Sequence, residues 1–270
     1  MPWSLTDDVS DFMSRAGAFL AENPVLNAPL LSEVAYLAAV APSDQDLLLG
    51  AWSDEAGSIC GSFVRAPRHN PLMTHMSTEA LVQLVTELPG LAGVGVPESL
   101  SSQAVAAWKR AGSTLVPRQR FTVFRLRELA DGHRPLGRAR VAVASDRPLL
   151  YRWFDELMAG LPDDPSDRAY VIDDPLDFGR LVLWEVDDVP VAMCGRSRTL
   201  ADAVRLGPWY APDDNVVGAE GAFMAASAAA SREAQHVLVL APEDADEEAR
   251  RLVAAGFAPA ATRVALTQVV

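Results

Sequence analysis

The chain has 270 residues, half of them apolar, which is enough for one large domain or two modest ones with a sizeable core. Its formal net charge of −13 at pH 7 argues against nucleic acid as a partner, because phosphate contacts need clustered lysines and arginines. No run of about 18 apolar residues occurs, so no membrane span is predicted. The four histidines and two cysteines are dispersed along the chain, so no metal site is predicted.

Apolar periodicity and turn residues divide the first half of the chain into alternating helices and strands. In chain order we predict helices at 6–22 and 26–39, a β-hairpin at 47–67, a strand and a helix at 71–89, a strand and a helix at 94–112, and a last strand at 121–129. The helix that follows residue 76 contains no glycine near its start, and Ser77 is expected to cap it without forming a phosphate site.

The second half repeats this order. It contains a predicted helix at 147–159, a hairpin at 181–200, a strand at 203–212 with a helix at 218–234, a strand and a helix at 238–256, and a last strand at 261–270. Gly112 and Gly256 are expected as the matching C-terminal caps of the two helices. The polar segment 129–137 indicates a linker, and we therefore predict domains at 1–130 and 138–270.

Both hairpins have a tryptophan at the end of the first strand and a Cys-Gly pair near the end of the second. Trp52 and Trp184 are expected to anchor the core. Cys60 and Cys194 are expected as reduced, buried thiols, and the N-terminus lacks the basic segment and apolar core of a secretory signal, which predicts a cytoplasmic protein. The apolar balance and an Ala-rich helix leave room for a homodimer.

The segment VRLGPWYAPDDNVVGAEGAFMAASAAAS, residues 204–231, has the layout of a strand, a loop and a helix N-terminus. Proteins hold phosphates with this layout, because backbone N–H groups and the helix dipole favour an anion. The loop nevertheless carries Asp213, Asp214 and Glu220, and no lysine or arginine occurs between Pro212 and Ser231.

From about residue 140 to the end, the chain resembles the GNAT superfamily of N-acetyltransferases, most closely in RLGPWYAP before the helix and in ARRLVAAGFAP near the end. Through FLAENPVLNAPLL and LWEVDDVPVAMCGRS, the whole chain resembles a bacterial subgroup in which a GNAT-like half precedes a catalytic one. The resemblance implies an α/β fold of two GNAT-like halves in tandem, each a mixed, mostly antiparallel sheet flanked by helices, with a degenerate first half.

The resemblance also implies acetyl-CoA as co-substrate and an amine of a small molecule or a protein as acceptor. The pantetheine arm would pair with a splayed strand, here 204–210, and the pyrophosphate would lie on the loop and helix N-terminus. The implied cofactor-binding residues are Leu206, Pro208, Trp209, Tyr210, Asn215, Val216, Val217, Gly218 and Ala219. No catalytic residue is assigned, and neither Glu185 nor Asp187 is singled out as a base.

The cradle motif of the subgroup, Arg-Gly-x-Gly-x-Ala, falls on residues 215–220, and only Gly218 is retained. Asn215 replaces the cation, and Val216 replaces a glycine with a β-branched residue that resists positive φ. Glu220 can satisfy the helix dipole itself. Leu252 stands where a tyrosine often protonates the departing thiolate.

Two functions therefore remain open. The first is an N-acetyltransferase acting on an amine of a small molecule or a protein, which requires an open cleft beside 204–210 and free N–H groups at Val217–Ala219. The second is a non-catalytic protein on the same fold, used for binding or scaffolding, in which Trp209 or Glu220 could fill the cleft.

The positions of four further side chains bear on this choice. Tyr210 either lines the cleft or belongs to the core. Arg196, Arg198 and Arg205 flank the strand and are either surface residues or the source of the missing positive charge.

Overall fold

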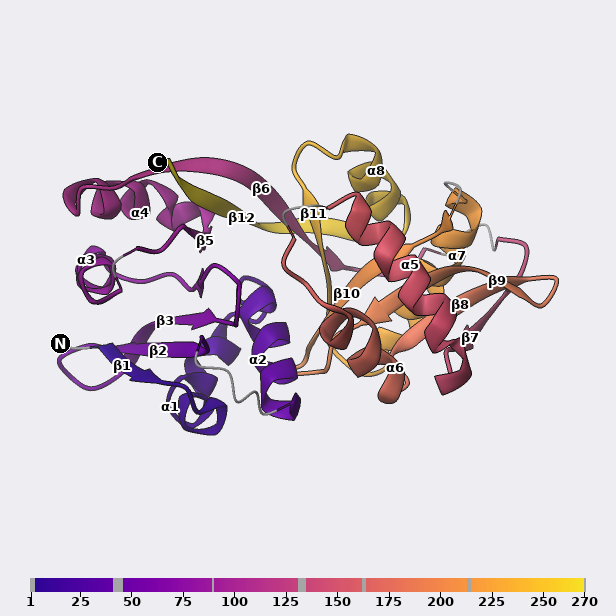
Figure 1. The fold of residues 1–270 in the computed structure, drawn as a ribbon, viewed down its shortest axis with the longest axis horizontal. Helices are drawn as coiled ribbons and strands as arrows, with labels where there is room; N and C mark the ends of the chain where they lie inside the picture. Colours follow the sequence, from indigo (N-terminus) through magenta and orange to yellow (C-terminus); the bar gives the residue numbers. More distant parts are fainter. Residues whose placement is uncertain are drawn as a thin grey trace. The chain divides into compact units, whose positions relative to one another are not determined.

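The computed structural model describes residues 3–40, 46–88, 90–130, 135–161, 164–212 and 215–269 (Figure 1). The chain forms two compact units. The first comprises Met1–Phe124, Leu240–Arg250 and Pro259–Val270, and the second comprises Arg125–Val239 and Arg251–Ala258. The predicted domain bounds of 1–130 and 138–270 stay a prediction, and residues 131–134 of the predicted linker lie outside the described residues.

The first unit is a mixed sheet with helices. Its elements are β1 (Trp3–Thr6), α1 (Val9–Glu22), α2 (Ala28–Val40), β2 (Leu48–Ser53), β3 (Ile59–Arg65), β4 (Leu72–Met73), α3 (Thr78–Glu87), β5 (Gly93–Pro97), α4 (Glu98–Arg110), most of β6 (Thr114–Leu126) and most of β12 (Phe257–Val269). The strand order is β1-β2-β3-β4-β5-β12-β6. The β4–β5 pair is parallel, whereas β5 pairs antiparallel with β12.

The second unit has the same kind of sheet. Its elements are β7 (Arg138–Val141), the 3₁₀ turn η1 (Ala144–Asp146), α5 (Arg147–Ala159), the π-helical η2 (Ala169–Asp173), α6 (Asp174–Asp177), β8 (Leu181–Val186), β9 (Val189–Arg196), β10 (Ala203–Tyr210), α7 (Val216–Ala230), and parts of β11 (His236–Pro242) and α8 (Asp246–Ala254). The strand order is β11-β10-β9-β8-β7, in which only β10 and β11 pair in parallel. The predicted α/β class is confirmed, and no described helix is long and apolar enough to cross a membrane.

Several local predictions are confirmed in atomic detail. The Ala80 N–H donates to Ser77 Oγ at 3.1 Å, so Ser77 caps α3. Gly112 and Gly256 adopt φ of +84° and +97° after α4 and α8, the left-handed conformation expected of residues that end a helix. Trp52 and Trp184 are both buried, as expected of core anchors.

Other boundaries differ from the sequence prediction. The first helix begins at Val9 because Asp8 accepts the N–H groups of Ser10 and Asp11, and β1, which was not predicted, precedes it. The last helix begins at Asp246 because β11 continues through Pro242. The Glu243 N–H then donates to Arg120 O at 2.9 Å, which keeps the chain extended past the predicted helix start.

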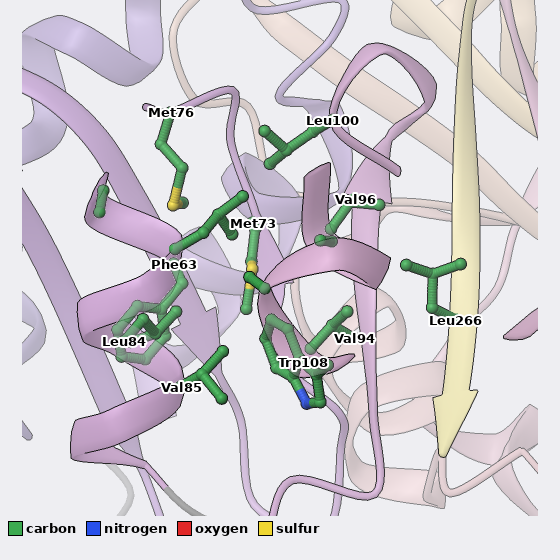
Figure 2. Close-up of a cluster of buried hydrophobic side chains, with 14 of the residues drawn as sticks. Phe63, Met73, Met76, Leu84, Val85, Val94, Val96, Leu100, Trp108 and Leu266 are labelled. Atoms are coloured by element: carbon green, nitrogen blue, oxygen red, sulfur yellow. The ribbon is translucent and has the colours of Figure 1, made fainter. Parts of the chain in front are cut away.

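Strand β12 belongs mostly to the first unit, although the sequence order places it after the second half. Its residues Arg263–Thr267 pair antiparallel with Gly93–Pro97 of β5. Val264 and Leu266 of β12 enter the apolar cluster of the first unit. Figure 2 shows Leu266, on the yellow strand, pointing toward Val94 and Val96.

Successive side chains of a strand point to opposite faces, so Arg263 lies on the other face of β12 from Val264 and Leu266. It is itself almost fully buried. Its guanidinium donates to three backbone carbonyl groups: Leu26 O at 3.0 Å, Met73 O at 2.8 Å and Gly95 O at 3.2 Å. Among the described residues it has no carboxylate partner, and burial lowers the pKa of Arg263 to about 10. A single cation therefore joins β12 to the start of α2 and to strands β4 and β5.

Candidate cofactor site at strand β10 and helix α7

Strand β10 has a parallel partner over only part of its length. Ala203–Arg205 pair with His236–Leu238 of β11. From Leu206 to Tyr210, β10 stays paired with β9 on its other edge, and within the second unit no described residue of β11 pairs with it there. The edge of Leu206–Tyr210 that faces away from β9 thus lacks a strand partner in this unit.

A bulge marks the point where the pairing changes. Leu206 lies opposite Arg196 and Trp209 opposite Cys194, so Gly207 and Pro208 together face a single residue, Gly195. Gly207 adopts φ of +120°, which a residue with a side chain resists. An extra residue in one strand increases its local twist and re-aims the residues beyond it, here Trp209 and Tyr210.

The N-terminus of α7 is capped by the chain itself. Asn215 Oδ1 accepts the Gly218 N–H at 3.0 Å, and Asn215 O accepts the Ala219 N–H at 3.0 Å. Two of the three N–H groups at Val217–Ala219 that a phosphate cradle needs are therefore engaged. From the sequence, Asn215 was interpreted only as the replacement of a positively charged residue, whereas in the structure it is the N-cap of α7.

The surroundings of this helix start are apolar. Val216 and Val217 are 42% and 50% exposed, and Glu220 also points to solvent. Asp213 and Asp214 lie outside the described residues. The helix start thus presents two exposed valines where the resemblance implies a pyrophosphate.

Each of the two glycines of α7 has a packing reason. A Cβ on Gly218 would lie 3.0 Å from Val191 Cγ2 and 3.2 Å from Asn215 Nδ2, so glycine leaves room for the cap. A Cβ on Gly221 would overlap the ring of Trp184, which packs flat against the helix at that point. The Trp184 indole is fixed in turn by its N–H, which donates to Leu136 O at 3.2 Å.

Trp209 faces α7. Its ring meets Phe223 edge-on with centroids 5.3 Å apart, and Phe223 lies 5.4 Å from Phe257. Phe223 and Phe257 are buried and Trp209 is half-buried, and Trp209 was one of the two side chains that the sequence suggested could fill a closed cleft. Glu220, the other, is exposed.

Tyr210 faces the opposite side of the sheet. Its ring centroid lies 6.3 Å from that of buried Trp153 on α5, and its hydroxyl donates to Glu156 Oε2 at 2.9 Å. Tyr210 is thus half-buried, with its ring on the core and its hydroxyl at an exposed carboxylate. Sequence reasoning missed Glu156. The only available signal was its place three residues after a buried tryptophan on an amphipathic helix.

The three arginines that flank β10 are all engaged. Arg196 is buried, so it is not the surface residue that was one of the two positions predicted for it, and it bonds Glu233 at 2.5 Å and Gly179 O. Arg198 pairs with Asp174 at 2.7 Å, and Arg205 donates to Tyr170 Oη at 2.7 Å. These cations stabilise the second unit and do not replace the missing charge of the loop.

Glu185 is held in an ion-pair network. Its buried carboxylate accepts Arg140 Nε at 2.5 Å and Arg138 Nε at 3.1 Å. These two arginines, Arg140 foremost, lower the pKa of Glu185, and Arg140 likewise lowers that of Asp146. The other candidate, Asp187, lies in the exposed β8–β9 turn.

A pH-dependent stability follows from this network. A carboxylate whose pKa is lowered on folding stabilises the protein above its ordinary pKa and loses that contribution as the pH falls through the folded value. Glu185→Gln should therefore lower the melting temperature at pH 7 and flatten its decline below about pH 4.5. Thermal unfolding from pH 7 to pH 3 checks this. Asp187→Asn is the control, and equal slopes in the two variants would contradict the prediction.

The remaining candidates behave as structural residues. Leu252, at the position of the usual leaving-group acid, is buried. Cys194 is buried and Cys60 half-buried, both as free thiols, and burial raises the pKa of Cys194 to about 12. No cluster of His, Cys, Asp and Glu in the described part of the chain could hold a metal ion.

No family model and no curated protein matches the sequence. Solved structures match the fold. A GNAT-family acetyltransferase from Colwellia psychrerythraea is 7% identical, with a TM-score of 0.62 over 99% of both chains. A GCN5-related N-acetyltransferase from Sphaerobacter thermophilus is 16% identical, with a TM-score of 0.63 over 98% of this chain and 95% of its own.

A GCN5-related N-acetyltransferase from Kribbella flavida is 14% identical, with a TM-score of 0.54 over 88% of this chain and 95% of its own. The TM-scores show a shared fold, and identities this low leave the activity to be argued from the site. The matches to the Colwellia and Sphaerobacter proteins cover both units described above. The chain therefore has, over nearly its whole length, the fold of the GNAT acetyltransferases.

Proposed function

We propose that the protein is an acetyl-CoA-dependent N-acetyltransferase that transfers an acetyl group to an amine. The observation that carries this proposal is the edge of β10 at Leu206–Tyr210, which has lost its parallel partner within the second unit while β9 still holds its other edge. Unpaired backbone groups on a fixed strand suit the amides of a pantetheine arm. The bound thioester would supply the activated acetyl group.

Several residues of β10 would bind the pantetheine arm. Backbone N–H and C=O groups alternate between the two edges of a strand, so only one of the adjacent residues Trp209 and Tyr210 can turn both groups to the arm. Leu206 precedes the bulge, and Pro208 can offer only its carbonyl. Trp209 is held by Phe223, so the strand is rigid where the arm would lie. In the first half, the helix capped by Ser77 contains no glycine, so we assign transfer to the second half.

The helix N-terminus fits the cofactor less well than the strand does. Asn215, Val216, Val217, Gly218 and Ala219 offer fewer free donors than a pyrophosphate cradle needs, because Asn215 takes the Gly218 and Ala219 N–H groups. We therefore expect affinity to come mainly from the pantetheine arm.

The Asn215 cap also favours a second candidate, a non-catalytic binding or scaffolding protein. The cap, the absence of Lys and Arg between Pro212 and Ser231, and the buried Leu252 all favour it. In both cases we propose a cytoplasmic protein with reduced thiols, an amine or protein partner rather than nucleic acid, and room for a homodimer.

Calorimetric titration with acetyl-CoA tests the proposal, and Asn215→Asp is the informative variant. Aspartate caps a helix as well as asparagine does, so stability should stay within about 0.5 kcal/mol. Its charge would repel a nearby pyrophosphate, so acetyl-CoA affinity should fall by several-fold to about tenfold.

S-acetylpantetheine, which lacks the phosphates, is the matched ligand, and its affinity should not change in Asn215→Asp. Micromolar binding of acetyl-CoA by the unaltered protein supports an acetyltransferase. If the folded protein binds neither ligand at millimolar concentration, the acetyltransferase proposal fails and the scaffolding protein takes its place.

A further inference from the structure

Four exposed apolar side chains of the second unit gather at one end of its sheet. Tyr210, the last residue of β10, lies opposite Met193 of β9, so α7 begins near the end of the sheet that carries the β8–β9 turn. Strand β7 starts at this end too, because Arg138 pairs with Glu185 just before the turn. The four side chains are Leu136 (78% exposed), Val189 (59%), Val216 (42%) and Val217 (50%).

Buried Trp184 connects the start of β7 with the first turns of α7. Its ring lies against Gly221, which follows Val217 by one helical turn on the same side of the helix. Its indole N–H donates to Leu136 O at 3.2 Å. Leu136 and Val217 are therefore held on either side of one fixed indole ring.

Val189 lies on the same face of the sheet. Val186 shares a face with Trp184, because two residues separate them in β8, and Val186 pairs with Val189 across the turn. Val191, two residues further along β9, lies 3.0 Å from the position that a Cβ on Gly218 would take, so the first turn of α7 packs over this strand. We call the surface formed by Leu136, Val189, Val216 and Val217 the apolar end.

The charges around the apolar end are mostly negative. Asp187 in the β8–β9 turn and Glu220 in the second turn of α7 are exposed, and neither forms an ion pair with the described residues. Arg138, at the start of β7, is already bonded to Asp188 at 2.6 Å and to a second carboxylate. Residues 212–231 contain no lysine or arginine. The surface thus combines exposed apolar side chains with negative charge that nothing on it balances.

We propose that the apolar end binds an amphipathic, positively charged segment of another protein. Contiguous exposed apolar side chains are typical of surfaces where proteins meet. Apolar residues of the segment would bury the leucine and valines, and its lysines or arginines would pair with Asp187 and Glu220. A second copy of this chain fits less well, because a two-fold interface would bring two identical acidic surfaces together.

This inference goes beyond the proposed function. None of the four side chains belongs to the edge of β10 that would hold the pantetheine arm, and the segment is bound as a partner rather than acetylated. The apolar end would bind it equally well in an acetyltransferase and in a non-catalytic protein.

Fluorescence anisotropy with a labelled synthetic peptide tests the proposal. The peptide consists of leucine and lysine, is about 14 residues long, roughly four helical turns, and has its leucines on one face. At about 150 mM salt, where long-range attraction to an acidic protein is screened, we expect a Kd of roughly 1–100 μM. The same peptide with glutamate at every lysine position should bind at least about tenfold more weakly.

Paired variants locate the binding. Replacement of both Val189 and Val217 by threonine keeps their branched shape but makes them polar, and it should weaken binding of the lysine peptide by about tenfold. Val253→Thr, at a valine of α8 that is 55% exposed, is the matched control and should leave the affinity unchanged. Asp187→Asn together with Glu220→Gln should weaken the lysine peptide and strengthen the glutamate peptide, and asparagine tolerates the φ of +50° at residue 187.

Equal peptide affinities in the double threonine variant and in Val253→Thr would overturn the proposal, and so would equal affinities for the lysine and glutamate peptides. Sedimentation velocity of the protein without peptide tests the other occupant. We expect the double threonine variant to sediment as the unaltered protein does. A dimer that dissociates in this variant would instead assign the apolar end to a second copy of the chain.

Discussion

Replacement of Arg263 by alanine is expected to lower the free energy of unfolding by about 3 kcal/mol or more. The guanidinium donates to the carbonyl groups of Leu26, Met73 and Gly95, and each buried acceptor left without a donor costs roughly 1–3 kcal/mol. The lost side chain also leaves a cavity beside β12. Relief of the desolvated charge offsets part of the loss, which is why we give the lower end of the range.

Denaturant unfolding measures this change, and Arg110→Ala is the matched control. Arg110 lies in the exposed last turn of α4, where removal of one cation costs less than about 1 kcal/mol. Arg263→Lys should also be less stable than the unaltered protein, since an ammonium cannot reach three carbonyls with the fork geometry of guanidinium. An Arg263→Ala protein as stable as Arg110→Ala would show that the backbone pairing and apolar packing of β12 hold it without Arg263.

Gly221→Ala is expected to destabilise the second unit by roughly 1–3 kcal/mol, the usual result of overpacking. The new methyl group would overlap the ring of Trp184, which is buried and tethered to Leu136 O, so the ring cannot turn aside. The helix must then move away from the sheet. Because α7 also positions Gly218 and Asn215, the acetyl-CoA affinity of the second unit should fall with its stability.

Gly17→Ala supplies a control with the opposite sign. Gly17 lies inside α1, where an added Cβ would meet only the flexible end of the Met13 side chain at 3.1 Å. The same substitution should there stabilise the protein by roughly 0.5–1 kcal/mol, because alanine has the higher helix propensity. Thermal unfolding of the two variants side by side isolates the effect of packing, and a stabilised Gly221→Ala would contradict our account of this glycine.

Features determined by neighbouring residues could be predicted from the sequence. The Ser77 cap, the left-handed Gly112 and Gly256, and the two hairpins all depend on interactions within a few residues. The place of β12 could not be predicted in this way. Its partner β5 lies more than 160 residues earlier by register, since Val264 pairs with Val96, and apolar alternation is the same whichever strand it joins.

In the candidate site too, features set by neighbouring residues could be predicted, and features set by distant contacts could not. The pattern around residues 203–231 predicted the strand, the loop and the helix, yet it treated Asn215 only as a missing member of a motif and assigned no role to Gly221. Their roles depend on contacts with Gly218 and Trp184 that a one-dimensional motif does not contain. Glu156 was missed because a glutamate on an exposed helical face has no local signal that distinguishes it from solvent-facing acids.

The late position of β12 in the sequence has a consequence for synthesis. Residues up to Phe124 leave the ribosome before Pro259–Val270 are translated, a gap that takes on the order of 10 s at typical rates. During that interval, β5 lacks its partner β12, so the strand that carries Val94 and Val96 has an open edge. A nascent chain in this state is prone to pair with other chains. We expect it to depend on chaperone binding or rapid translation until Leu266 covers those valines.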